Sequence, residues 1–207
     1  MQNNIIGVID YNSGNLTSVC NTLDKIGVEY KVSSSVKELG KTQKILFPGV
    51  GHAENAMKEL KKLKLDTFLK NTTKPVLGIC VGMQLLFNNS EESSSTETTQ
   101  CLGIIPGTVQ KFKKYEVGII PHMGWNEVSQ ITPQHPIFKN IPDYSDSYFV
   151  HSYYCQPENK KHVVAMTDYK TKSFCCVVQK DNFLGIQFHP EKSSLIGQKT
   201  LENFCKN

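Results

Sequence analysis

The stretch Pro75-Val76-Leu77-Gly78-Ile79-Cys80-Val81-Gly82-Met83-Gln84 decides the fold, because it joins an apolar run to a helical pattern through a cysteine between two glycines. The pattern predicts a buried strand over 75–79 and a helix over 81–87. A nucleophile at such a junction stands above the edge of a sheet, and the N–H groups that open the helix favour a thiolate and an oxyanion. Taken alone, a small buried cysteine on a strand explains the same residues equally well.

Strands and helices alternate through the first half of the chain. The patterns predict strands at 5–9, 28–32 and 45–47 and helices at 15–26 and 53–60. The second half is β-rich, with expected strands at 109–112, 125–128, 148–154, 163–166, 174–178 and 183–188, and it ends in a helix at 193–204. Residues 88–100 contain no large apolar side chain and predict a solvated loop. We expect an α/β fold, one domain over 1–207 with a mixed, mostly parallel sheet flanked by helices.

The composition excludes several classes of protein. With 207 residues, 20% charged residues and a net charge of +4, the chain can form a core and is too mildly charged for a disordered protein. All 23 basic residues are lysine, which argues against dedicated nucleic-acid binding. The start has no signal-peptide pattern, and no apolar run is long enough to cross a membrane. The seven cysteines lack zinc spacing, so we expect reduced thiols in a cytoplasmic protein without a metal or cofactor.

A cysteine nucleophile needs a base, and His189 is the best placed of the six histidines. It follows the expected strand at 183–188, so it too lies at the end of a strand. Glu191 comes two residues later, and in extended chain the two side chains point the same way. Cys80, His189 and Glu191 can therefore form a nucleophile, base and orienting carboxylate. A surface His-Pro turn beside a solvated glutamate is the competing interpretation.

GICVGMQ (78–84) together with QFHPEKS (187–193) resembles the triad-type, class I glutamine amidotransferases. The wider matches are DYNSGNL (10–16), PGVGH (48–52), PHMGWN (121–126) and FVHSYY (149–154). They run over essentially the whole chain and resemble the glutaminase subunits of imidazole glycerol phosphate synthase. The resemblance implies a Cys-His-Glu triad that releases ammonia from glutamine through a glutamyl thioester.

The resemblance also implies roles for other residues. The oxyanion hole would use backbone around Val50 and Gly51 together with the N–H of Val81. The residues implied to bind glutamine are Gly49, Gln84, His151, Ser152 and Tyr153. Glycines 49 and 51 would make a peptide flip in this loop easy.

The partner implied by the resemblance is a (β/α)8-barrel cyclase that forms a heterodimer with the glutaminase. The cyclase uses the ammonia to make imidazole glycerol phosphate and AICAR in histidine biosynthesis. By position, the partner-facing residues are Asn15, Met123, Trp125, Tyr148 and Lys192. For Trp125 the competing interpretation is a core side chain, and for Lys192 a solvated one.

Three other interpretations remain open from the sequence. A paralogous glutaminase supplies ammonia for amidino groups of surface sugars, and Gly118-Ile119-Ile120 lacks the basic residue that often precedes PHMGWN. A scaffold without activity would only bind the barrel, although the complete set of Cys80, His189 and Glu191 argues against it. A cysteine peptidase is opposed by Gln84 and by PHMGWN.

Overall fold

The parallel half of the sheet carries the N-terminal part of the chain. The computed structural model describes residues 5–12, 14–95 and 97–207. Five strands lie in the order β2-β1-β3-β4-β13, and every neighbouring pair is parallel. Their bounds are Tyr30–Ser33, Ile6–Ile9, Lys44–Gly49, Val76–Cys80 and Phe183–Ile186. Strands β1, β4 and β13 are buried along their full length, which explains their near-continuous apolar sequences.

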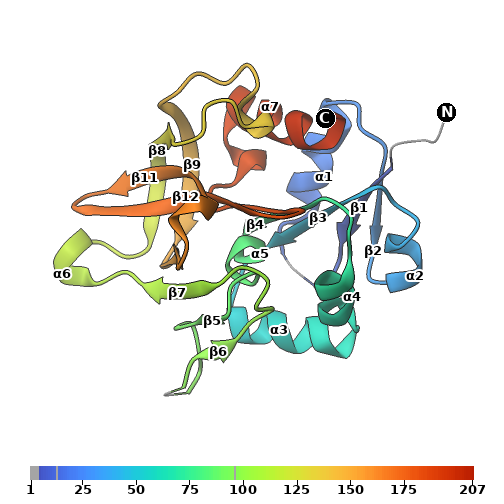
Figure 1. Ribbon diagram of the computed structural model, residues 1–207, viewed down its shortest axis with the longest axis horizontal. Helices are drawn as coiled ribbons and strands as arrows, with labels where there is room; N and C mark the ends of the chain where they lie inside the picture. Colours follow the sequence, from blue (N-terminus) through green and yellow to red (C-terminus); the bar gives the residue numbers. More distant parts are fainter. Residues whose placement is uncertain (1–4, 13, 96) are drawn as a thin grey trace.

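Helices cover both faces of this half. Helices α1 and α7 lie on one face, and α3 and α4 lie on the other (Figure 1). Their bounds are Leu16–Lys25, Ser194–Lys206, Ala53–Lys62 and Leu65–Asn71. This half also contains two one-turn helices, α2 (Val36–Leu39) and α5 (Val81–Gln84). Since α5 follows β4 directly, the chain turns sharply at Cys80.

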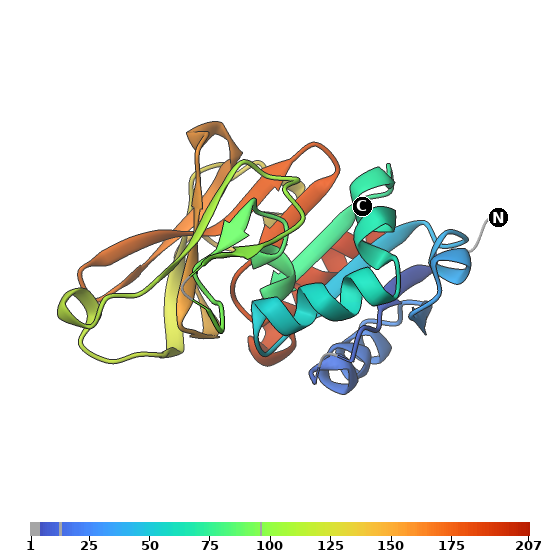
Figure 2. The ribbon, with the colours of Figure 1, turned by 90° about the horizontal axis from the view of Figure 1, so that it is seen from below.

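Antiparallel strands extend the sheet away from the helices, as Figure 2 shows on its left side. Strand β12 pairs with β13, β10 and β11, and β11 leads on to β8 and β9. Strands β7 to β12 span Gly107–Lys111, His122–Gln130, Ser145–His151, Tyr153–Pro157, Val163–Tyr169 and Lys172–Lys180. Short elements link these strands: α6 (Lys114–Val117), η1 (Pro136–Phe138), η2 (Lys160–His162) and η3 (Pro190–Lys192). The expected α/β fold with a mixed sheet is confirmed, and the five strands of its helix-covered half are all parallel.

The structure corrects three local predictions. The strand expected at 148–154 is two strands, β9 and β10, which separate at Ser152 and pair with different neighbours. The loop expected at 88–100 contains a small hairpin of β5 (Asn89–Ser90) and β6 (Thr99–Gln100), where β5 pairs with β7. Helices α2 and α4 were not predicted, and α5 ends at Gln84, three residues before the predicted helix end at 87. Tertiary pairing decides such short elements more than local pattern does.

Most of the cysteines lie in the core. Cys101, Cys155, Cys175, Cys176 and Cys205 are buried, and Cys20 is half-buried on α1. Burial is the leading influence on the pKa of Cys155 and of Cys176, which it raises well above the usual range. These thiols behave as small apolar side chains. None of the helices in the described ranges is long and apolar enough to cross a membrane.

Candidate active site

Cys80 is held in a strained conformation at the junction of β4 and α5. Its φ is 53° and its ψ is −109°, a region that side-chain-bearing residues rarely adopt. Strand β4 is paired on both sides, with β3 and with β13, so the surrounding sheet fixes this turn. Such strain persists where the neighbouring structure determines it, and here it directs the cysteine into a cavity.

The two glycines that flank Cys80 serve close packing. Neither Gly78 nor Gly82 has a positive φ, so the strained backbone conformation is that of Cys80 itself. A Cβ on Gly78 would lie 2.7 Å from the carbonyl oxygen of Gly82, and one on Gly82 would overlap the carbonyl oxygen of Phe47. The first turn of α5 is therefore pressed against β3 and β4, and only glycine fits at both positions.

His189 and Glu191 form a buried pair beside this junction. The Nδ1 of His189 lies 2.8 Å from Oε1 of Glu191, and both side chains are almost completely buried. Glu191 reaches the ring from the short 3₁₀ turn η3, whereas the sequence interpretation expected extended chain. Asn15 donates its side-chain N–H to the same carboxylate oxygen at 3.2 Å. Within the described chain, Nε2 of His189 has no hydrogen-bond partner.

Charges at the site favour a protonated His189. Burial alone would lower the pKa of His189, but the negative charge of the Cys80 sulfur and the Glu191 carboxylate outweigh it and raise that pKa to about 10. Burial raises the pKa of Glu191, yet its hydrogen bond and attraction to His189 leave the value below the usual range. The three groups therefore act as one coupled electrostatic unit.

This coupling predicts a measurable change when the sulfur is removed. In Cys80→Ala the charge that most strongly raises the pKa of His189 is absent, while burial and Glu191 remain. We expect the pKa of His189 to fall by roughly one to three pH units. Nitrogen-15 NMR titration of the histidine side chains in the two proteins measures it. An unchanged pKa would mean that Cys80 and His189 are not coupled.

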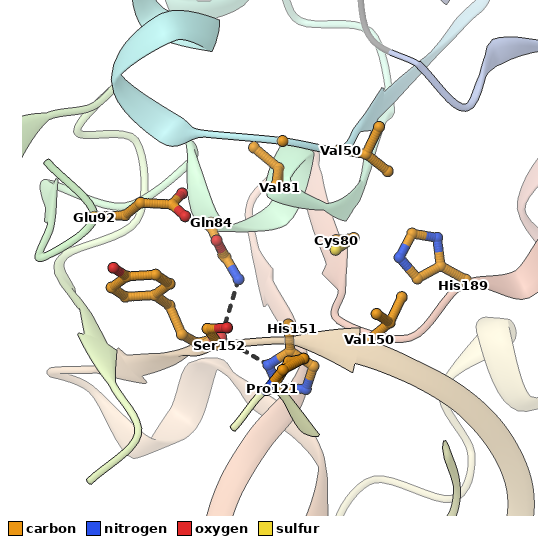
Figure 3. Close-up of a pocket in the computed structure, with 12 residues that line it drawn as sticks. Val50, Cys80, Val81, Gln84, Glu92, Pro121, Val150, His151, Ser152 and His189 are labelled. Atoms are coloured by element: carbon orange, nitrogen blue, oxygen red, sulfur yellow. Dashed lines mark hydrogen bonds between the residues drawn. The ribbon is translucent and has the colours of Figure 1, made fainter. Parts of the chain in front are cut away.

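A cavity of about 320 Å³ brings most of the predicted site residues together (Figure 3). Cys80 and His189 line it, as do Val50, Gly51 and Val81 of the predicted oxyanion hole. The predicted glutamine contacts Gln84, His151, Ser152 and Tyr153 also line it. Gly49 is not among the lining residues, because it belongs to β3 and packs behind the loop, where a Cβ would lie 2.8 Å from the backbone nitrogen of Gly82. Gly51 has a φ of +95°, a backbone conformation that favours glycine. Of the two glycines in this loop, Gly51 is therefore the one that gives the loop its conformational freedom.

Two residues of the site were given no role by sequence reasoning. Gln187 accepts a hydrogen bond from Nε2 of Gln84 at 3.1 Å and donates one to the sulfur of Cys80 at 3.6 Å. Glu92 lines the cavity, and its carboxylate accepts the N–H of Ala53, the first residue of α3, at 2.7 Å. Gln187 stands inside QFHPEKS, two residues before the base, and Glu92 lies in the segment expected to be a solvated loop.

His151 contributes its ring as well as its backbone. Its Nδ1 donates to the carbonyl oxygen of Tyr153 at 2.7 Å, which also accepts from Nε2 of Gln84 at 3.0 Å. Its Nε2 faces Nδ1 of His122 at 3.2 Å. Burial and the nearby charge of His122 lower the pKa of His151 to about 3, and burial also lowers the pKa of His122.

Four of the five predicted partner-facing residues lie together on the surface. Met123 and Trp125 lie on β8 and are 62% and 51% exposed. Trp125 pairs with Tyr148 of β9, and the centres of their two rings are 5.8 Å apart. The exposed Lys192 of η3 places its Nζ 5.9 Å from the centre of the Tyr148 ring. Trp125 is thus not a core side chain. Asn15 differs from the other four, since it is only 7% exposed and holds Glu191.

Known proteins are similar to this chain in sequence and in fold. Residues 7–207 match the family "Glutamine amidotransferase class-I". The chain is 42% identical over 206 residues to the "Imidazole glycerol phosphate synthase subunit HisH" of Dehalococcoides mccartyi strain CBDB1, covering 98% of this chain and 97% of that protein. It is 41% identical over 203 residues to the subunit of the same name from Acinetobacter baylyi, covering 97% of both.

Solved structures support the same fold. A glutamine amidotransferase from Thermotoga maritima superposes with a TM-score of 0.67 at 14% identity, covering 100% of both chains. The glutaminase domain of CTPS from Trypanosoma brucei superposes with a TM-score of 0.66 at 17% identity, covering 98% of this chain and 94% of that one. The sequence matches and the geometry agree: this chain belongs to the class I glutamine amidotransferase family, in the branch formed by the HisH subunits of imidazole glycerol phosphate synthase.

Proposed function

We propose that this chain hydrolyses glutamine to glutamate and ammonia with Cys80, His189 and Glu191, and passes the ammonia to a cyclase subunit. The observation that carries the proposal is the arrangement of these three residues. Cys80 and His189 line one cavity from the ends of neighbouring strands, and Glu191 lies behind His189 at 2.8 Å. This is the geometry of a nucleophile, a base and a group that orients the base.

In the first half of the reaction, the proton of Cys80 resides on His189 and the sulfur attacks the carboxamide carbon of glutamine. The carbonyl oxygen becomes an oxyanion, which the N–H of Val81 and an N–H of the loop at Val50 and Gly51 stabilise. The intermediate collapses as the C–N bond breaks, and His189 gives its proton to the departing nitrogen. Ammonia leaves, and glutamate remains bound to Cys80 as a thioester.

In the second half, water attacks the thioester while His189 takes up its proton. The C–S bond breaks, glutamate is released and the Cys80–His189 pair is restored. Glu191 keeps Nδ1 of His189 protonated, so that Nε2 faces the reacting atoms through both halves. Asn15 fixes the carboxylate in turn.

The charges of the cavity suit an amino acid. The Glu92 carboxylate faces it from the hairpin of β5 and β6 and is a counterion for the α-ammonium group of glutamine. Backbone of 151–153 is available to the α-carboxylate, and Gln84 braces that backbone through the carbonyl oxygen of Tyr153. Recognition of both charged groups leaves the carboxamide as the part that reaches Cys80.

The partner we infer is a (β/α)8-barrel cyclase that docks on Met123, Trp125, Tyr148 and Lys192. This patch adjoins the triad, because the backbone N–H of His189 donates to the backbone carbonyl oxygen of Tyr148 at 2.9 Å. The names of the relatives support imidazole glycerol phosphate synthase, and with it histidine biosynthesis in the cytoplasm, over the surface-sugar pathway. The cyclase would then convert the ammonia and a phosphoribulosyl-formimino nucleotide to imidazole glycerol phosphate and AICAR.

Reconstitution with the candidate cyclase tests the function. Glutamate formation from glutamine is measured with the chain alone, with the complex, and with the complex plus the cyclase's nucleotide substrate. We expect a strong rise on addition of the nucleotide. A complex that forms no glutamate under any condition would contradict glutaminase activity. Growth of a deletion strain without histidine, in cells with no second copy, would contradict the histidine pathway.

The partner patch makes its own prediction. Trp125→Ala removes an exposed aromatic side chain whose only ring neighbour in the described structure is Tyr148. We expect the Kd for the cyclase to rise about 30-fold, since a central aromatic residue of an interface contributes roughly 2 kcal/mol. Tyr115→Ala is the matched control, because Tyr115 is 81% exposed on α6 outside the patch. Equal affinities of both variants and the unchanged chain, measured by calorimetry, would place the interface elsewhere.

A further inference from the structure

A hydrogen-bonded chain of side chains runs from β8 to the nucleophile. It starts at Asn126, whose Nδ2 donates to the carbonyl oxygen of Asp168 at 2.7 Å and whose Oδ1 lies 2.7 Å from Nε2 of His122. His122 meets His151, and His151 donates to the Tyr153 carbonyl. From there the chain continues through Gln84 and Gln187 to the sulfur of Cys80.

The partners of the two imidazoles fix their hydrogens. The carbonyl oxygen of Tyr153 only accepts, so Nδ1 of His151 carries a hydrogen. The Oδ1 of Asn126 also only accepts, and the amide cannot be reversed, because its oxygen would then face the Asp168 carbonyl. Nε2 of His122 therefore carries a hydrogen as well.

The two remaining ring nitrogens face each other at 3.2 Å. If both rings were neutral, each of these nitrogens would present a lone pair and no hydrogen bond could form. One further proton between them satisfies the contact. The pair then holds three ring hydrogens and a single positive charge.

The surroundings place this charge on His122. Its ring lies between those of Tyr169 and Phe149, with centres 4.0 and 5.0 Å away and planes 20° and 17° from parallel, an arrangement that stabilises a cation. A second proton on the pair is excluded, because burial and, after it, the charge of His122 lower the pKa of His151 to about 3. Burial also lowers the pKa of His122, and its hydrogen bond to Asn126 counteracts only part of that effect. The charge is assigned to His122 from the facing ring nitrogens and from the two stacked aromatic rings.

Few other ionisable groups face the pair. Tyr169 of β11 stacks on His122, and its hydroxyl donates to the carbonyl oxygen of Ile119. Across the cavity stand Cys80 and the His189–Glu191 pair, and the Glu92 carboxylate lies at the far side of Gln84 (Figure 3). Among the described residues, His189 is the only histidine that forms an ion pair with a carboxylate, so neither His122 nor His151 does.

We propose that His122 and His151 share one proton and that this buried cation selects the α-carboxylate of glutamine. His151 lines the cavity and His122 contacts its ring at 3.2 Å, so the positive charge lies next to the segment 151–153, while Glu92 supplies a negative charge at another part of the cavity lining. A zwitterionic amino acid matches both. His122 acts through His151 as a positioning residue, and its role rests on the proposed glutaminase function.

The protonation state is measured directly by nitrogen-15 NMR of the histidine side chains in the full chain between pH 5 and 9. We expect an imidazolium at His122 and a neutral ring with hydrogen on Nδ1 at His151 at pH 7. Asn126→Leu removes the acceptor at Nε2 while keeping the side-chain size, so His122 should lose its proton at lower pH than in the unchanged chain. Two neutral rings at pH 7 in the unchanged chain would overturn the proposal.

Ligand selectivity tests the role of the charge. Glutamine and glutaminamide, which lacks the carboxylate, are titrated into the Cys80→Ala complex with the cyclase, with and without His122→Phe. We expect His122→Phe to weaken glutamine binding roughly tenfold and to leave glutaminamide binding unchanged. His135→Phe is the control, since His135 is half-buried on the loop before η1 and is not among the residues that line the cavity.

The outcomes separate the two proposals. Equal loss of both ligands in His122→Phe would show a structural role and overturn carboxylate selection. If the variant does not fold, the NMR experiment on the unchanged chain and on Asn126→Leu still decides the protonation state. An unchanged complex that hydrolyses glutamine but contains two neutral rings refutes only this inference, whereas a complex with no glutaminase activity refutes the proposed function.

Discussion

Cys80→Ala should lower glutamine hydrolysis by the complex by at least about 10⁴-fold, while KM or the affinity for glutamine changes little. Loss of the nucleophile removes the covalent route altogether, and what remains is the contribution of the oxyanion hole and of substrate binding. The side chain is only 3% exposed and makes few polar contacts, so alanine fits the site without loss of the fold.

Glutamate release under single-turnover and steady-state conditions measures the effect. Cys20→Ala is the matched control, because Cys20 is a half-buried thiol on α1 that does not line the cavity. It should retain full activity. Glutaminase activity of Cys80→Ala close to that of the unchanged complex would refute the triad, and no role for His189 as its base would then remain.

Gly82→Ala should unfold the site or the whole chain. The added Cβ would overlap the carbonyl oxygen of Phe47, a backbone atom of β3, which cannot rotate away as a side chain could. Either α5 or the edge of β3 must move, and both carry active-site backbone. We expect a loss of about 3 kcal/mol or more in the free energy of unfolding, a large share of the stability of an ordinary domain.

Urea unfolding followed by circular dichroism measures this loss. Gly14→Ala is the control, since a Cβ at Gly14 would meet only the Val50 side chain at 3.5 Å, an ordinary contact. A Gly82→Ala protein as stable as the Gly14→Ala protein would show that α5 is not pressed against β3 as described.

Much of the site could be predicted because its residues are tied to strong local patterns. The alternation of apolar strands and amphipathic helices predicts a sheet covered on both faces, and ligands bind at the carboxyl ends of such strands. Cys80 is the last residue of β4 and His189 follows β13, two strands that lie side by side. The sequence therefore pointed to both residues through the ends of their strands. It could not show that these strands are neighbours.

Residues without a local pattern were predicted poorly. Glu92 lies in a polar segment that reads as solvated, and it becomes part of the cavity only because β5 pairs with β7 and brings the carboxylate to the start of α3. Asn15 was assigned to the partner surface from its place in a motif, but α1 turns its side chain toward Glu191, 176 residues away in the chain. Long-range contacts of this kind leave no periodic signal.

By itself, the amino-acid sequence determined the fold class and the family and predicted a nucleophile and a base, because each of these rests on short motifs of residues near one another in the chain. Only the tertiary structure decided which charges face the cavity and how protons are arranged around it. His122 and His151 are 29 residues apart and meet because β8 and β9 pair in register, with His122 opposite His151. Their shared proton follows from partners on four separate segments, which only packing brings together.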